Sequence, residues 1–138
     1  VLELRDVRTK AFYTPMHAVD PYVVLLGLVG LARYNVSTPV LVRLHVTLSA
    51  EATSPEHPAH EYFVQRYEYY LDGLTRAFSG CAERGTLRPG TTPVQAAQAT
   101  IAAQDGLQLL WLLHGDTIDM PGGIEAHLRR LIVFPEAH

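Results

Sequence analysis

A helix-capping residue stands directly before a proline at three places in this sequence: Asp20-Pro21, Thr38-Pro39 and Thr92-Pro93. The Asp or Thr side chain accepts a hydrogen bond from the free N–H groups at a helix start, and proline fits the first helical position, where no N–H is needed. Two other prolines, at His57-Pro58 and Met120-Pro121, also precede helical patterns, and Asp119 is the expected cap of the second. These helix starts divide the chain into segments of helical length.

The apolar residues between these starts recur at helical spacing. They predict six helices, over about residues 1–13, 21–35, 39–53, 58–84, 93–114 and 121–133. The fourth has the clearest apolar stripe, formed by Phe63, Tyr67, Leu71, Leu74, Phe78 and Ala82. Gly73 and Gly80 lie inside this helix, where they either permit a close helix crossing or are simply tolerated. The expected fold is all-α, a helical bundle of about six helices that forms one domain over residues 1–138.

Residues 40–52 carry two conflicting patterns. Apolar and polar residues alternate from position 42 to position 50, which is the period of a half-buried β-strand. Other apolar residues of the segment fit a helical stripe, namely Val40, Leu41, Leu44, Leu48 and Ala52. The segment begins at a proline, is long for a strand and has no second alternating run to pair with. These features favour a helix.

The fifth predicted helix is apolar on nearly all sides between residues 107 and 113. A helix of this kind is buried all round, so in a small domain one face must pack inward and another against a second subunit. The sixth predicted helix has an apolar face as well. We therefore expect a homodimer through these two helices, with interface residues Gly106, Leu110, Leu113, Ile124, Leu128 and Leu131.

Composition and charge exclude several classes of protein. The net charge of −3, without a block of like charge, argues that this segment does not bind nucleic acid by itself. Cys81 is the only cysteine, so the chain has no internal disulfide and no paired-cysteine metal site. The apolar run 22–32 is too short to span a bilayer, and the run 94–113 carries too many polar residues. We expect a cytoplasmic protein with no membrane partner.

Catalytic motifs are missing from the sequence. It has no nucleophile elbow, P-loop or dinucleotide-binding fingerprint, so we do not expect an enzyme. His57 and His60 lie beside two glutamates, but no second cluster completes a metal site, and we interpret them as polar residues at a helix start. Neither a metal nor a cofactor is expected. Asp105 is the one charge in residues 94–113, and we interpret it as a hydrogen-bonded boundary residue in preference to a pocket group.

Four segments resemble the TetR/AcrR family of transcriptional regulators. They are PVLVRLHVTLSAEATSPEHPAHEYFVQRY (39–67), AAQATIAAQDGLQLLWLLHGDTIDM (96–120), the link GTLRP (85–89) with Thr92-Pro93, and the opening VLELRD. The resemblance implies an all-α domain that binds a small effector and dimerises through its last two helices. It also implies that operator DNA, if bound, is contacted only by an N-terminal helix-turn-helix domain that this chain lacks.

Accordingly, we expect the regulatory domain of a ligand-responsive transcriptional repressor. The alternative is a helical small-molecule-binding or protein-interaction domain with no DNA-linked role. Pockets between bundle helices have apolar walls with a few polar groups, so the expected ligand is small and lipophilic or aromatic. The candidate ligand-binding residues are Phe12, Met16, His45, Phe63, Tyr67, Gln104, Gln108 and Trp111. Phe63 and Trp111 also fit a plain core role.

Overall fold

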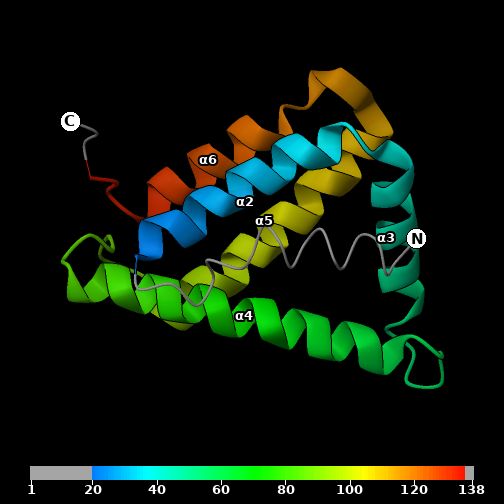
Figure 1. Ribbon diagram of the computed structural model, residues 1–138, viewed down its shortest axis with the longest axis horizontal. Coiled ribbons are helices and arrows are strands. Elements are labelled where there is room, and N and C mark those ends of the chain that lie inside the picture. The colour runs from blue at the N-terminus through cyan, green and yellow to red at the C-terminus, as the bar shows by residue number, and fades with distance from the viewer. Residues whose placement is uncertain (1–19, 136–138) are drawn as a thin grey trace.

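The computed structural model describes residues 20–135. They form α2 (Pro21–Val36), α3 (Pro39–Glu51), α4 (His60–Glu83), α5 (Pro93–His114), the short 3-10 helix η2 (Gly115–Thr117) and α6 (Met120–Leu131), as Figure 1 shows. Within this range the only β pairing is an isolated antiparallel bridge between Leu87 and Ile132. The all-α prediction is therefore confirmed for the described part of the chain. The predicted helix 1–13, with Phe12, and Met16 after it lie outside the described residues.

Three of the expected helix caps are present. Asp20 accepts a hydrogen bond from Tyr22 N at 2.9 Å and begins α2. Asp119 accepts one from Gly122 N at 2.9 Å and begins α6. Thr92 and Gln95 form a reciprocal capping box at the start of α5, with both bonds at 3.1 Å.

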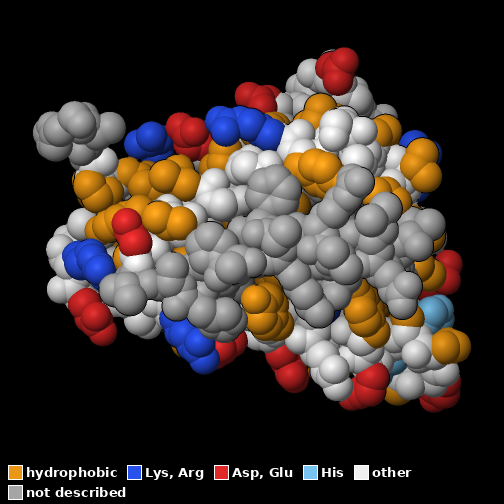
Figure 2. Space-filling model, viewed as in Figure 1, with side chains coloured by type: hydrophobic (Ala, Val, Ile, Leu, Met, Phe, Trp, Pro, Cys, Tyr) orange, Lys and Arg blue, Asp and Glu red, His pale blue; other side chains and the backbone are white. Residues whose placement is uncertain are grey.

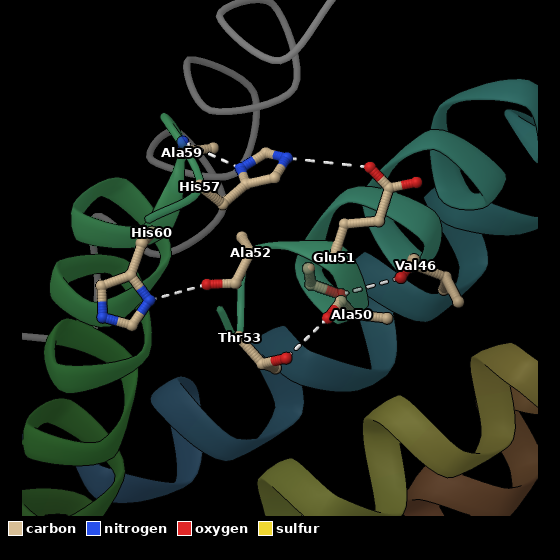
Figure 3. A network of polar contacts seen from close by, with 9 residues as sticks. Val46, Ala50, Glu51, Ala52, Thr53, His57, Ala59 and His60 are labelled. Atoms are coloured by element: carbon tan, nitrogen blue, oxygen red, sulfur yellow. Dashed lines mark hydrogen bonds and ion pairs between the residues drawn. The ribbon is translucent and has the colours of Figure 1, made fainter. Parts of the chain in front are cut away.

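Of the other two predicted helices, α3 begins at Pro39 as predicted but lacks the expected side-chain cap, and α4 begins later than predicted. Thr38 makes no side-chain cap for α3, because its backbone (φ −133°, ψ 59°) is not in the extended conformation from which a capping side chain reaches the first turn. Its hydroxyl donates to Asn35 O, at 3.4 Å, near the end of α2. The fourth helix begins at His60 instead of residue 58. The reason is a turn in which His57 Nδ1 accepts a hydrogen bond from Ala59 N at 3.0 Å, while His57 Nε2 lies 3.7 Å from Glu51 Oε2 (Figure 3).

Residues 39–51 are helical, so the pattern of helical spacing outweighed the alternation. The next helix, α4, ends in a Schellman motif. Thr86 N donates to Cys81 O at 2.9 Å, Gly85 N donates to Ala82 O at 3.1 Å, and Gly85 takes a φ of +73°. A residue with a Cβ is strained in that conformation, so the position calls for glycine.

Most of these helices pack around α5. In Figure 1, α2 and α6 lie side by side above it, α4 runs beneath it, and α3 stands at one end of the molecule. The core between them is built from side chains of α2, α4 and α6 that are almost fully buried, including Leu25, Leu28, Leu74, Phe78, Ile124 and Leu128. Figure 2 shows a further apolar cluster where α2 begins beside the end of α6, and there the Tyr22 and Phe134 ring centroids lie 6.1 Å apart.

Gly80 lies where α4 approaches the start of α2. A Cβ built on Gly80 would come within 3.2 Å of Pro21 Cγ, tighter than most real contacts. Of the two interpretations offered for the glycines inside this helix, close approach is therefore the one that holds at Gly80.

Candidate functional site

A cavity of about 590 Å³ lies between α3, α4 and α5. Small-molecule pockets in proteins usually measure about 300–1,000 Å³ and are mostly apolar, and this cavity meets both conditions. Its walls among the described residues are His45, Val46, Ser49, Ala50, Ala52, Thr53, His60, Phe63, Val64, Tyr67, Asp105, Gln108 and Leu109.

Helical spacing brings these residues to one place. On α3, the residues at 45, 46, 49 and 50 recur at intervals of three and four and so share one face. On α4, Phe63 and Tyr67 are one turn apart. In the cavity wall the Phe63 ring lies beside the His45 ring, with centroids 5.6 Å apart. The apolar side of the cavity is thus formed where α3 meets α4.

Tyr67 and Asp105 join α4 to α5 inside this wall. The Tyr67 hydroxyl donates a hydrogen bond to Asp105 Oδ2 at 2.7 Å. Burial raises the pKa of Tyr67 well above its usual value, and the neighbouring Asp105 carboxylate raises it further. Tyr67 is therefore a neutral donor at physiological pH. Asp105 is hydrogen-bonded, as interpreted from the sequence, but it also lines the cavity, which that interpretation set aside.

Three other polar side chains of the wall are bonded to backbone carbonyls. Ser49 Oγ donates to Val46 O at 3.0 Å, and Thr53 Oγ1 donates to Ala50 O at 2.8 Å. His60 Nδ1 lies 2.7 Å from Ala52 O. Figure 3 shows the contacts of Thr53 with Ala50 and of His60 with Ala52, between the end of α3 and the start of α4.

Gln108 is the buried polar residue of the site that stands out. Its side chain is 2% exposed, and no donor among residues 20–135 reaches Oε1. Gln108 also borders a second, much smaller cavity, of about 10 Å³, next to α2 and α6. A buried acceptor without a partner costs free energy. Gln108 Oε1 is therefore a candidate to accept a hydrogen bond from a ligand.

The structure brings together half of the predicted ligand-binding residues. His45, Phe63, Tyr67 and Gln108 line the main cavity. Gln104 and Trp111 do not line it, which corrects the prediction. Gln104 borders the small cavity, and Trp111 belongs to the core.

The reason for that correction is the turn of α5. Successive helical residues lie about 100° apart, so Gln104 and Trp111 share a face that is rotated away from Asp105 and Leu109. Sequence reasoning missed Ser49, Ala50 and Thr53 because small and polar side chains do not stand out as an apolar stripe. Their positions three, four and seven residues after Val46 were the available signal.

The predicted dimer-interface residues divide into two groups. Leu110 is 44% exposed, Leu113 is 68% exposed, and Gly106 is exposed on the same helix, while Leu131 is half-buried. Ile124 and Leu128 are 1% and 0% exposed, inside the chain's own core. The prediction was wrong for these two residues, because a side chain without exposed area has no surface for a second subunit.

Comparison with protein-family models, with curated proteins and with solved structures finds no match to this chain. Among residues 20–135, no group of three His, Cys, Asp or Glu side chains is placed to hold a metal ion. In the same range no single helix is long and apolar enough to cross a membrane. Only α2 and α3 taken together reach that length and hydropathy, and they are bent by 110°.

Proposed function

We propose that this chain is the effector-binding and dimerisation domain of a ligand-responsive transcriptional regulator, acting as a repressor. The observation that carries the proposal is the cavity of about 590 Å³, with its mostly apolar wall and few polar groups. Its size and lining suit a small lipophilic or aromatic effector. The resemblance of residues 39–67 and 96–120 to TetR/AcrR regulators supplies the regulatory role.

The position of α5 supports a link between ligand and assembly. Asp105 and Leu109 line the cavity, while Gly106, Leu110 and Leu113 lie on an exposed face of the same helix. A ligand that shifts α5 would therefore change the surface offered to a second subunit. In a dimeric regulator the two DNA-reading heads must match half-sites about one helical turn apart, so a small change in their spacing weakens binding.

Gly106 gives independent support to the dimer. It lies in the interior of α5, where glycine costs up to about 1 kcal/mol relative to alanine. Within the described residues nothing would come within 4 Å of a Cβ at this position. No contact among the described residues thus requires a glycine at position 106. Close packing of α5 against a second copy of the chain would explain it.

The coding sequence upstream of Val1 provides the first test. A helix-turn-helix pattern there supports the proposal, and its absence refutes it in favour of a small-molecule-binding domain without a DNA-linked role. In the full-length protein, a compound that raises the thermal stability of this domain should weaken operator binding about 5- to 150-fold in a gel-shift titration. A compound that binds tightly and leaves operator affinity unchanged would contradict the regulatory role.

A further inference from the structure

We propose that the cavity selects a neutral lipophile that donates a hydrogen bond, such as a phenol or an alcohol, over an ether or a carboxylate of the same shape. This inference rests on the proposed function in that it takes the cavity to be the ligand site. It adds the chemical class of the ligand, which the size and apolar lining of the cavity do not determine.

The first step concerns four hydroxyl and imidazole donors of the cavity wall, which are already in use. The hydroxyl hydrogens of Ser49, Thr53 and Tyr67 are donated to Val46 O, Ala50 O and Asp105 Oδ2 respectively. A carbonyl oxygen only accepts, so the contact of His60 Nδ1 with Ala52 O at 2.7 Å places a hydrogen on Nδ1 and uses it. These four side chains therefore have no hydrogen left for a ligand while the ring of His60 is neutral.

The second step concerns what these groups still offer. A hydroxyl that donates its hydrogen keeps lone pairs that accept, and a neutral imidazole protonated on Nδ1 accepts on Nε2. Ser49, Thr53, Tyr67 and His60 thus present acceptors to the cavity. A ligand carboxylate would bring a further set of acceptors and a negative charge close to Asp105, which disfavours it.

The third step is the unpartnered acceptor. Gln108 Oε1 is buried at the cavity wall, and no donor among residues 20–135 reaches it. Leaving a buried acceptor unpaired costs free energy, and a ligand hydroxyl or N–H that reaches Oε1 removes this cost. A methyl ether of the same shape has no hydrogen to donate and leaves Gln108 Oε1 unpaired.

Three matched compounds test the inference on this chain: para-phenylphenol, its methyl ether and para-phenylbenzoate. Isothermal titration calorimetry, supported by thermal stabilisation, should show that the phenol binds about tenfold or more tightly than either of the others. Ether or carboxylate binding equal to or tighter than that of the phenol would overturn the donor inference and leave the ligand site standing. Binding of none of the three would overturn the inference and remove the cavity from the proposed function as well.

A variant pair assigns the effect to Gln108. Gln108→Met keeps a similar volume and removes the amide oxygen, so the phenol should lose its advantage and bind within about twofold of the ether. Gln98→Met, on an exposed position of the same helix, should keep the full preference. A tenfold preference that survives in Gln108→Met would overturn the assignment to Gln108. The three-compound comparison on the unsubstituted chain decides the donor question even if Gln108→Met fails to fold.

Discussion

Tyr67 on α4 donates a hydrogen bond to Asp105 Oδ2 on α5 across 2.7 Å, at the wall of the cavity. The two residues are 38 positions apart in the chain, so this contact forms only when the two helices have packed. Substitution of either residue therefore tests both the packing of these two helices and the integrity of the candidate site.

Tyr67→Phe removes the donor and leaves the Asp105 carboxylate with one hydrogen bond fewer. We expect the free energy of unfolding to fall by about 1–2 kcal/mol in urea denaturation. A double-mutant cycle with Asp105→Asn isolates the pair, and the coupling should be at least about 0.5 kcal/mol. Additive effects of the two substitutions would show that the contact does not stabilise the fold.

The same pair predicts how stability depends on alkaline pH. Burial, aided by Asp105, raises the pKa of Tyr67 in the folded chain, whereas an unfolded tyrosine ionises near pH ~10. Above that pH the unfolded chain has released a proton that the folded chain retains, so stability falls as pH rises. Denaturation followed from pH 8 upward should show a steeper loss for the unsubstituted chain than for Tyr67→Phe. Parallel curves would contradict the prediction.

His127 predicts an effect on the acid side. Its Nε2 lies 2.9 Å from the buried Thr100 hydroxyl, which itself donates to Ala96 O at 2.7 Å. Burial lowers the pKa of His127, and the nearby Arg130 guanidinium lowers it further. As pH falls below about 6.5, the unfolded chain takes up a proton that the folded chain resists, so stability declines.

The matched variants for this prediction are His127→Gln and His114→Gln. The glutamine amide keeps a donor for Thr100 and cannot titrate, so the decline between pH 7 and pH 5 should become shallower in His127→Gln. His114 is exposed at the end of α5 and takes no part in the Thr100 contact, so His114→Gln is the matched control. Thermal unfolding across this pH range measures both, and an unaltered slope in His127→Gln would rule the mechanism out.

The buried face of α6 yields a packing prediction. Leu128 is fully buried, so Leu128→Ala should reduce the free energy of unfolding by about 2–5 kcal/mol through the lost contacts and the cavity left behind. Leu113→Ala, at a side chain that is 68% exposed, should change the stability of the monomer by less than about 0.5 kcal/mol. Similar losses for the two variants in dilute protein would contradict this assignment of faces.

The sequence predicted the helices of the described region well because their signals are local. Asp20, Thr92 and Asp119 accept hydrogen bonds from N–H groups in the next turn of the chain. The apolar stripe of α4 indicates which face of that helix is buried. Thr38 does not cap α3 because its backbone is not in the extended conformation of a capping residue, and a Thr-Pro pattern does not show that conformation.

The site was less accessible to sequence reasoning because it depends on how neighbouring helices are rotated. Phe63 and Tyr67 follow from the stripe of α4, but Trp111 was placed in the pocket although it faces the core. The periodicity of α6 shows that Ile124 and Leu128 are apolar on one face. It does not show whether a helix of the same chain or a second subunit covers that face, and here the same chain covers it.

The dimer prediction now rests on the exposed face of α5. Leu110→Asp puts a charge on a residue that is 44% exposed in the single chain, so it should leave the fold intact and disfavour burial against a second copy. Val40→Asp, at a position on α3 that is 69% exposed, is the control. In sedimentation at micromolar concentration the unsubstituted chain and Val40→Asp should be dimers, and Leu110→Asp a folded monomer. A monomeric unsubstituted chain, or a Leu110→Asp chain that remains dimeric, would show that this face of α5 is not the interface.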